Sequence, residues 1–295
     1  MIIDAFPYAG EEILKIRLHE LSPVVTKFLI IESNRTQSGR EKPYHFEQQS
    51  EKYNDFLSQI IYVKLDDSKI DSNGIGETDW SQEHRVRQAI SNEGFQKLEE
   101  NGLFLMANDT LLISDADEIP RKECVEDFDK SNQNVLCLNH YFNSYYLNLY
   151  SNYRTWGWYG TICIRAGNIS NNIQYLRNVK DRLPHSGKSG EGWHFSNILS
   201  NGFRSLYSKL INNIEPHSKD HLYGYKNIRA IKKAFDKCLY EDLCFFFSDN
   251  WNNRAIPLEI LENEFLPKYV QENLDKFKYI LYSEPEYRSG QVKNL

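Results

Sequence analysis

The chain has 295 residues and a formal net charge of −6, a length that suits one large α/β domain. Nucleic-acid binding depends on clustered Lys and Arg, so this acidic balance argues against it. The sequence contains no run of about eighteen apolar residues and no secretory signal at its N-terminus, so we expect no transmembrane helix and a cytoplasmic location. The cysteines are odd in number and fit no metal-binding spacing, so we expect reduced thiols at Cys124, Cys137, Cys163, Cys238 and Cys244.

Strands and helices alternate in the first part of the chain. Short apolar runs predict buried strands at residues 1–6, 27–32, 60–63 and 111–114. Helical periodicity is present at residues 11–21 and is clearest at residues 81–101, after which Gly102 predicts a C-cap. Alternation of this kind predicts a largely parallel sheet with helices on its faces.

The pattern changes after residue 129. Two aromatic-rich runs, at residues 135–146 and 160–166, predict longer strands that are compatible with antiparallel pairing. Helical patterns follow at residues 196–209, 227–239 and 266–282. We expect one domain over residues 1–295, with a nucleotide-binding half at 1–130 and an acceptor-binding half with the C-terminal helices at 131–295.

A cluster of carboxylates, Asp115-Ala116-Asp117-Glu118, follows the strand predicted at residues 111–114. Ligands of open α/β sheets bind beyond the carboxyl ends of the strands, and hard divalent ions take oxygen ligands. Repulsion among neighbouring acids is relieved if a cation lies between them. The cluster therefore predicts a metal site that holds the diphosphate of an activated sugar. The alternative is a solvated acidic turn that caps a helix beginning at Pro120.

Two further polar patterns precede this cluster. Glu83 and Arg87 are four residues apart on a predicted helix and so share one face. They form either a surface ion pair, or a guanidinium that Glu83 holds toward the carboxylate cluster or a phosphate. Glu32 and Asn34 follow the second strand, in a loop that either binds the base or ribose of a nucleotide or forms a plain turn.

A glycine-containing segment leads into Gly192-Trp193-His194-Phe195-Ser196. His194 between two aromatic residues is either a core histidine or, given the loop before it, a metal ligand or phosphate contact. Trp193 is a candidate for substrate binding, although we favour a packing role for it. Lys209, further along, is a candidate for neutralising phosphate charge.

Six segments together resemble glycosyltransferase family 17, whose members add N-acetylglucosamine (GlcNAc) to N-glycans. They occur in the family's order over nearly the whole chain, which is more specific than any single motif. The segments are Asp4-Ala5-Phe6, Ile16 through Leu21, Phe28 through Thr36, Asp115 through Pro120, Gly192 through Ser196, and Pro267 through Val270.

The resemblance implies an α/β fold of the GT-A type, the nucleotide-diphospho-sugar transferase fold, with a mostly parallel central sheet flanked by helices. It also implies a UDP-sugar donor, expected to be UDP-GlcNAc, a glycan acceptor, inversion at the anomeric carbon, and Mn²⁺ or Mg²⁺ as cofactor. The metal ligands would be Asp115, Asp117 and His194, with Asp115 also a candidate for the ribose.

The remaining roles in such a reaction are divided among charged side chains. Arg87 and Lys209 would add positive charge at the diphosphate. Glu191 and Asp181 are the two candidates for the base that removes the acceptor proton. The aromatic segment 141–159 departs from the family, so the acceptor is not inferred from the resemblance.

Two alternatives to a transferase remain at this point. The first is a non-catalytic protein of the same fold that binds a carbohydrate or a nucleotide sugar. The second is a metal hydrolase that uses the same acids. Two-metal hydrolases usually take further His and Asp ligands from several strand ends, and the sequence offers few of these.

Overall fold

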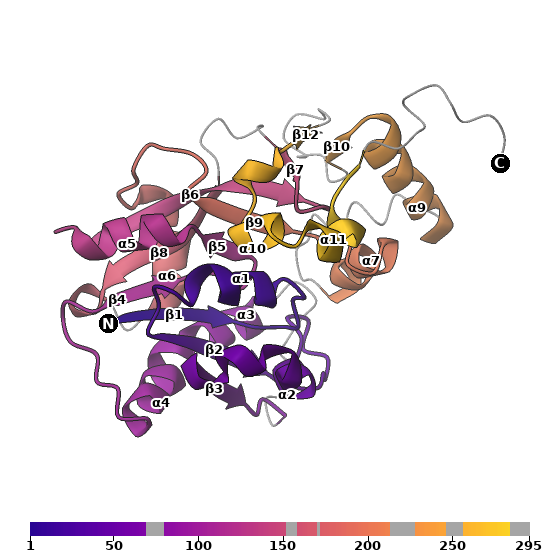
Figure 1. The fold of residues 1–295 in the computed structure, drawn as a ribbon. Coiled ribbons are helices and arrows are strands. Elements are labelled where there is room, and N and C mark those ends of the chain that lie inside the picture. The colour runs from indigo at the N-terminus through magenta and orange to yellow at the C-terminus, as the bar shows by residue number, and fades with distance from the viewer. Residues whose placement is uncertain (69–79, 152–157, 170–171, 213–227, 246–255, 284–295) are drawn as a thin grey trace. The chain divides into compact units, whose positions relative to one another are not determined.

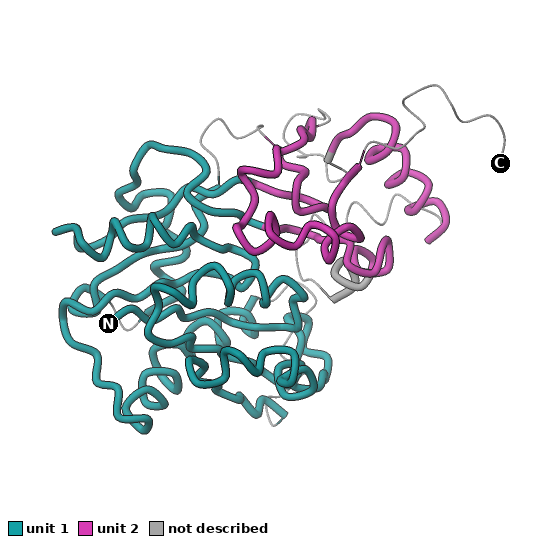
Figure 2. The backbone as a smooth tube through the Cα atoms, viewed as in Figure 1, with its two compact units in different colours: residues 1–141, 156–194, 212–215 teal, residues 142–155, 195–211, 216–295 magenta. Residues whose placement is uncertain are grey.

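The computed structural model describes residues 1–68, 80–151, 158–169, 172–212, 228–245 and 256–283, with side chains left undescribed at 208–212 and 245. The chain divides into two compact units (Figure 2). Unit 1 comprises residues 1–141, 156–194 and 212–215, and unit 2 comprises residues 142–155, 195–211 and 216–295. The predicted division at residue 130 concerned function, and it stays a prediction.

Parallel strands form the first part of the sheet in unit 1. The order is β4-β1-β2-β3, and the register places Ala5 beside both Leu29 and Ile113. All four strands predicted from apolar runs are confirmed, as β1 (Ile2–Pro7), β2 (Lys27–Ser33), β3 (Ile60–Leu65) and β4 (Thr110–Ile113). Their near-continuous apolar sequence fits strands that are covered on both faces.

The later strands of the chain pair antiparallel. The strand β8 (Trp158–Arg165) runs antiparallel to β4, and β6 (Val135–Ser144) runs antiparallel to β8. A short pair, β5 (Glu118–Pro120) and β9 (Gly192–Ser196), is also antiparallel. The sheet of unit 1 is therefore mixed. The antiparallel pairing suggested for the runs at 135–146 and 160–166 is confirmed, and the expectation of a mostly parallel sheet holds only for β4-β1-β2-β3. Antiparallel neighbours do not need the helical crossover that parallel neighbours require.

Helices cover both faces of this sheet (Figure 1). Because side chains alternate along a strand, Phe28 and Ile30 face one apolar cluster while Leu29 and Ile31 face the other. The first cluster includes residues of α1 (Leu14–Leu21), α2 (His45–Gln49), η1 (Ser50–Gln59) and α5 (Lys122–Lys130). The second includes residues of α3 (Ser81–Gln88), η2 (Ile90–Gly94), α4 (Phe95–Glu100) and α6 (Ile173–Asn178).

The helix predicted at residues 81–101 is present, with a π-helical turn, η2, between α3 and α4. Gly102 follows it with φ of +74°, the left-handed conformation that suits glycine at a helix end. Short 3-10 turns complete unit 1 at η3 (Ala166–Asn168) and η4 (Lys180–Arg182).

Unit 2 has its own apolar core, which includes Tyr145, Leu206, Phe235 and Tyr282. The helix predicted at 227–239 is confirmed, as α9 (Ile228–Asp236) continued by η5 (Lys237–Glu241). The helix predicted at 196–209 is present only from Phe203, as α7 (Phe203–Asn212), because Ser196 ends β9 and residues 197–202 are not helical. The third, predicted at 266–282, is broken into α10 (Lys268–Gln271), α11 (Leu274–Phe277) and η7 (Lys278–Ile280). The other short elements are β7 (Leu149–Ser151), β10 (Cys244–Phe245), β11 (Ile256–Pro257), β12 (Glu259–Ile260) and η6 (Asn263–Phe265).

The cysteines differ from the prediction at two positions. Cys238 and Cys244 form a disulfide, so the expectation of reduced thiols was wrong there. Cys124, Cys137 and Cys163 are free, as expected. Burial raises the pKa of Cys124 to about 11 and that of Cys137 to about 12, so neither thiol ionises near neutral pH.

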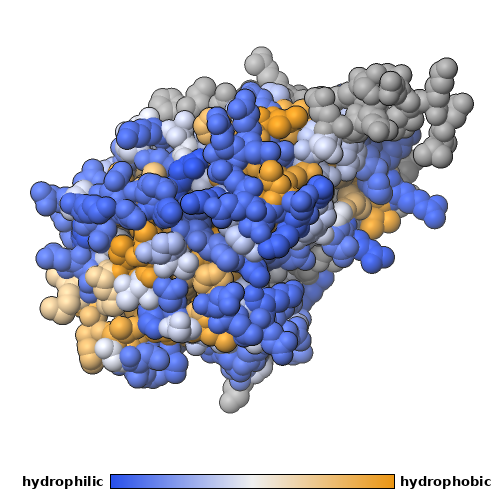
Figure 3. Space-filling view, viewed as in Figure 1, coloured by the Kyte–Doolittle hydropathy of each residue, from blue (hydrophilic) through white to orange (hydrophobic). Residues whose placement is uncertain are grey.

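The face of unit 1 that Figure 3 shows is mostly polar. In Figure 3, apolar colour on this unit gathers near the region where Figure 1 draws α4 and the start of β4. Phe104 and Met106, in the segment between these two elements, are among the exposed apolar side chains. Within the described part of the chain, every helix falls short of the length and apolar content that a bilayer crossing needs.

Candidate active site

The acid cluster directly follows β4, as the sequence predicted, and it forms the turn into β5, a strand that the sequence analysis did not predict. The backbone N–H of Asp115 donates to Oε2 of Glu118 at 2.8 Å, and the N–H of Glu118 donates to the carbonyl oxygen of Asp115 at 3.0 Å. The following helix, α5, has Arg121 as its N-cap, without a capping side chain. The alternative in which the acids cap that helix is therefore wrong. We call residues 115–118 the acid turn.

Arg17, from α1, fixes the backbone of the acid turn from inside the protein. Its Nη1 donates to the carbonyl oxygens of Asp115 and Glu118, each at 2.9 Å, and its Nη2 donates to Oγ of Ser114 at 2.6 Å. Asp4, on β1, balances its charge, with 2.8 Å between Nε and Oδ2. Both side chains are fully buried, so a buried charge pair holds the turn at the end of the sheet.

The prediction assigned no role to Arg17 or Asp4. Asp4 is a lone acid inside an apolar strand, and Arg17 lies three residues after Leu14 and four before Leu21, on the apolar stripe of its helix. Charges are almost never fully buried unless they are paired. An acid in a strand and an arginine on the buried face of the next helix are therefore a pattern that could have revealed the pair.

Asp115 is held by two guanidinium groups. Arg87, from α3, donates to both carboxylate oxygens, at 3.0 Å from Nε and 2.8 Å from Nη2. Its Nη1 forms an ion pair with Oε1 of Glu83 at 2.5 Å. Arg177, from α6, approaches the carboxylate of Asp115 at 3.0 Å. The interpretation of Arg87 as a guanidinium that Glu83 directs at the carboxylate cluster is confirmed. Burial alone would raise the pKa of Asp115, but Arg177 and Arg87 hold it below its usual value.

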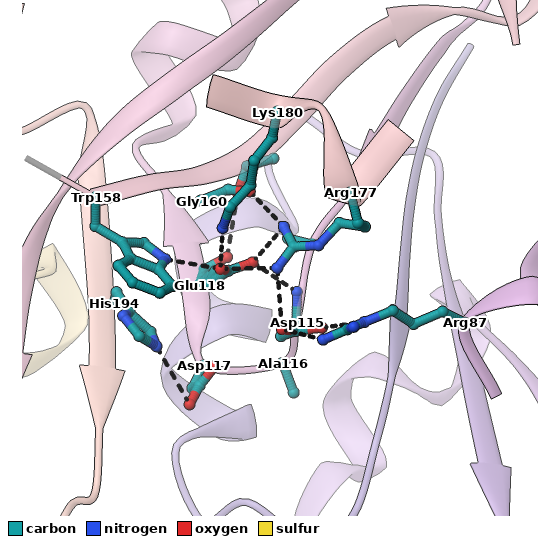
Figure 4. Close-up of polar contacts among 12 residues, drawn as sticks. Arg87, Asp115, Ala116, Asp117, Glu118, Trp158, Gly160, Arg177, Lys180 and His194 are labelled. Atoms are coloured by element: carbon teal, nitrogen blue, oxygen red, sulfur yellow. Dashed lines mark hydrogen bonds and ion pairs between the residues drawn. The ribbon is translucent and has the colours of Figure 1, made fainter. Parts of the chain in front are cut away.

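Glu118 is the most buried acid of the turn and is surrounded by donors (Figure 4). Arg177 Nη1 lies 2.8 Å from its Oε2, and its Oε1 accepts a 2.7 Å hydrogen bond from Nε1 of Trp158. Lys180 Nζ lies 3.5 Å from the same Oε1. Burial would raise the pKa of Glu118, yet the charges of Arg177 and Lys180 keep it well below its usual value. The carboxylate is therefore ionised at neutral pH.

Asp117 faces His194 across the short β5–β9 pair. The pairing sets Glu118 opposite His194, and Nε2 of His194 lies 3.7 Å from Oδ2 of Asp117. The imidazole stacks on the indole of Trp158, with 4.3 Å between ring centroids and 21° between planes. Of the three predicted metal ligands, Asp117 and His194 thus point toward each other, whereas the carboxylate of Asp115 points at arginines (Figure 4). Among the described residues, no group of three or more His, Cys, Asp and Glu is arranged to hold an ion.

Arg177, Lys180 and Trp158 were absent from the sequence prediction. They come from α6, η4 and the first residue of β8, all distant in sequence from the acid turn. No local spacing links them to it, and only the antiparallel return of β8 beside β4 brings them there.

Glu32 and Asn34, predicted to contact the nucleotide, are engaged with loops of the protein. Glu32 is buried, and the backbone N–H groups of His45 and Phe46 donate to its two oxygens at 2.7 and 3.0 Å. Asn34 accepts from the backbone N–H of Asp67 at 2.9 Å. Both side chains shape the loops that follow β2 and β3, and their contact with a nucleotide stays a prediction.

The remaining predicted residues lie in different settings. Glu191 is buried and accepts a 2.9 Å hydrogen bond from the backbone N–H of Asn139, whereas Asp181 is exposed in η4. Trp193 is 1% exposed, with the guanidinium of Arg121 4.3 Å from its ring centroid. The side chain of Lys209 lies outside the described residues.

Comparison with known families decides the membership of the chain. The family model described as glycosyltransferase family 17 matches residues 1–286. The chain belongs to glycosyltransferase family 17. This confirms the resemblance that the six segments carried.

Two relatives share the name β-1,4-mannosyl-glycoprotein 4-β-N-acetylglucosaminyltransferase. The rat protein is 24% identical over 317 residues, which cover 93% of this chain and 54% of the relative. The human protein is 29% identical over 116 residues, which cover 39% of this chain and 20% of the relative. This family 17 chain thus spans about half the length of the rat protein.

Solved structures give weaker likenesses. The inositol-1-phosphate CTP transferase from T. maritima has a TM-score of 0.31 at 10% identity, over 66% of this chain and 83% of that one. S. aureus TarS 1-349 has a TM-score of 0.28 at 10% identity, over 99% of this chain and 93% of that one. Scores this low carry no argument about the family 17 chain.

Proposed function

We propose that this protein is a metal-dependent, inverting glycosyltransferase with a GT-A type fold, and that it moves GlcNAc from UDP-GlcNAc to a glycan hydroxyl. The observation that carries the proposal is the acid turn at the end of β4, where Asp117 faces His194 in a chain of glycosyltransferase family 17. The names of the relatives support GlcNAc as the transferred sugar.

The donor groups at the acid turn fit a divalent ion. Asp117 offers a carboxylate oxygen, a ligand type that suits Mn²⁺, and His194 offers a ring nitrogen 3.7 Å from it, and neutral imidazole is the commonest metal ligand in proteins. Two protein ligands leave coordination positions for the diphosphate of a donor and for water. Asp115 already balances Arg87 and Arg177, so we assign it a place beside the ion or the ribose and not a direct bond to the metal.

In this proposal the protein's charged groups bind the donor's diphosphate and receive the acceptor's proton. A bound ion would neutralise charge on the departing UDP. Arg87 is partly exposed and lies beside Asp115, so it can add positive charge at the diphosphate, with Lys209 as a second candidate. A carboxylate takes the proton of the acceptor hydroxyl as that oxygen attacks the anomeric carbon, and Glu191 and Asp181 remain the candidates.

Binding measurements test this function before any acceptor is known. UDP-GlcNAc should raise the melting temperature in the presence of Mn²⁺ and leave it nearly unchanged with EDTA, since a ligand that binds only the native state stabilises it. Asp117→Ala should fold normally, lose the Mn²⁺-dependent shift and lose transfer. Full transfer by Asp117→Ala would reject the metal site. Metal-dependent binding without transfer to any acceptor would favour the non-catalytic alternative.

A further inference from the structure

Trp158 touches three residues of the acid-turn region at once (Figure 4). It is the first residue of β8, and its Nε1–H donates to Oε1 of Glu118 at 2.7 Å. Its ring stacks on the imidazole of His194, with 4.3 Å between centroids. Lys180 Nζ lies 4.3 Å from the indole centroid, a cation–π contact. The indole therefore joins a buried carboxylate to the histidine that faces Asp117.

The orientation of the indole follows from its anchor. An indole has a single hydrogen-bond donor, and here that donor is directed at a charged acceptor, which makes a short and strong bond. The carboxylate of Glu118 is fixed in position, because it is fully buried and pairs with Arg177 at 2.8 Å. Fixing one end of the rigid indole fixes its plane, and an aromatic partner stacked at 21° is fixed with it.

A histidine that faces a carboxylate keeps that orientation only if neighbouring groups restrict the rotation of its ring. Its ring turns about two single bonds, and only a narrow range of angles keeps Nε2 directed at Asp117. Loss of a group that orients a metal-binding histidine commonly lowers metal affinity by about 10–100-fold. In this chain the stacked face of Trp158 restricts rotation of the imidazole.

We propose that Trp158 is a positioning residue that transmits the fixed position of Glu118 to His194 and so keeps Nε2 of His194 directed at Asp117. The inference rests on the proposed function, because it takes Asp117 and His194 as the metal ligands. Trp158 itself touches neither the ion nor the donor in this scheme.

Two variants of Trp158 separate its two contacts, and its neighbour provides a matched control. Trp158→Leu removes both the donor and the stacked ring, whereas Trp158→Phe keeps a ring and removes only the donor. Tyr159, the next residue of β8, stacks on His185 with 4.9 Å between centroids. Because side chains alternate along a strand, Tyr159→Leu removes the same kind of stack on the other face of β8.

The readout is Mn²⁺ affinity, measured by electron paramagnetic resonance on the full chain with UDP present. Trp158→Leu should bind Mn²⁺ on the order of tenfold more weakly than wild type, Trp158→Phe should fall between them, and Tyr159→Leu should match wild type. Raising Mn²⁺ should restore transfer by Trp158→Leu to near the wild-type kcat, because a positioning defect weakens binding and leaves the bound state intact.

Each outcome decides for or against the inference. If Trp158→Leu and Trp158→Phe both bind Mn²⁺ within about twofold of Tyr159→Leu, the inference is overturned while the proposed function stands. If Trp158→Leu does not fold, Trp158→Phe alone decides, and wild-type affinity there rejects the anchoring role. If wild type with UDP binds no Mn²⁺, the metal site of the proposed function fails first, and the inference fails with it.

Discussion

Replacing Glu118 by Gln tests the charge balance of the acid turn, because this substitution keeps the shape of the side chain and removes its charge. The carboxylate accepts from Trp158 and Arg177 and from the backbone N–H of Asp115. An amide has one accepting oxygen and one NH₂ group. Whichever way the new amide is turned, its NH₂ group meets a donor, so at least one buried N–H group loses its acceptor. The substitution also leaves Arg177 and Lys180 facing each other across a neutral group.

The expected loss of stability follows from these contacts. Removing one partner of a buried ion pair costs about 3–5 kcal/mol, because the other charge stays buried without compensation. The amide oxygen still accepts one hydrogen bond, and Arg177 keeps Asp115 as a charged partner at 3.0 Å, so we place the loss near the lower end, at about 3 kcal/mol. For a unit of this size each kcal/mol shifts the melting temperature by about 2–4 °C, so Glu118→Gln should melt about 6–12 °C below wild type.

The stability difference between wild type and Glu118→Gln should depend on pH and become smaller in acid. The pKa of Glu118 is held well below its ordinary value of 4.5 in the folded protein, so its contribution is complete above pH 4.5. As the pH falls below 4.5 the unfolded chain takes up a proton that the folded protein does not, and the wild type loses stability. The gap between wild type and Glu118→Gln should therefore narrow in acid.

The assay is thermal unfolding followed by circular dichroism at about pH 7 and again at decreasing pH below 4.5. Glu123→Gln is the matched control, since Glu123 on α5 is 65% exposed and lies 4.0 Å from Lys122. An exposed pair of this kind contributes about 0–1 kcal/mol. If Glu118→Gln melts within about 1 °C of Glu123→Gln near neutral pH, the reasoning about the buried charges is refuted.

Three further substitutions test other parts of the structure. Arg17→Met leaves Asp4 buried without its partner and should cost about 3–5 kcal/mol in urea unfolding, whereas a loss below about 1 kcal/mol would contradict the buried pair. Burial lowers the pKa of His140 to about 3, so the unfolded chain alone gains a proton as the pH falls below 6.5, and stability should drop by up to about 1.4 kcal/mol per pH unit. His140→Leu should lose that slope between pH 6.5 and pH 4.5, and an unchanged slope would show that His140 does not cause it. Trp193→Phe should lower stability by about 1–3 kcal/mol and retain transfer, because Trp193 packs in the core; equal melting temperatures with lost transfer would assign it a role in the chemistry.

The sequence predicted those parts of the fold that local patterns encode. The parallel strands were recognisable because each is a short apolar run, and the acid turn because it directly follows one of them. The contact of Arg87 with Glu83 and Asp115 could also be offered as an interpretation, since helical spacing places Glu83 and Arg87 on one face. Family membership followed from ordered segments and not from any single residue.

The parts that were missed depend on contacts between distant segments. The antiparallel direction of β6 and β8 was suggested, but their partners in the sheet were not, because the pairing of β8 with β4 and of β6 with β8 depends on how the chain returns to the sheet. The disulfide between Cys238 and Cys244 depends on the bend between η5 and β10, which brings their Cα atoms to 5.3 Å. The last predicted helix breaks at Asn273, whose φ of −135° is not helical, although the apolar pattern continues past it.

The same reason explains what was missed at the site. Arg177, Lys180 and Trp158 carry no motif, and each is an ordinary residue until the sheet brings it to Glu118. The prediction explained the repulsion among the three acids by a cation between them, with a solvated acidic turn as the alternative. In the structure, arginines and a lysine from the protein already balance Asp115 and Glu118, which leaves Asp117 as the acid that faces His194.

In the proposed mechanism, Asp117 and His194 hold a divalent ion against the donor's diphosphate. Crystals grown with Mn²⁺ and UDP, measured at the manganese absorption edge, test it most directly. We expect one anomalous peak within bonding distance of Oδ2 of Asp117 and Nε2 of His194, in contact with the diphosphate. Bound UDP with the peak elsewhere, or with no peak, would contradict it.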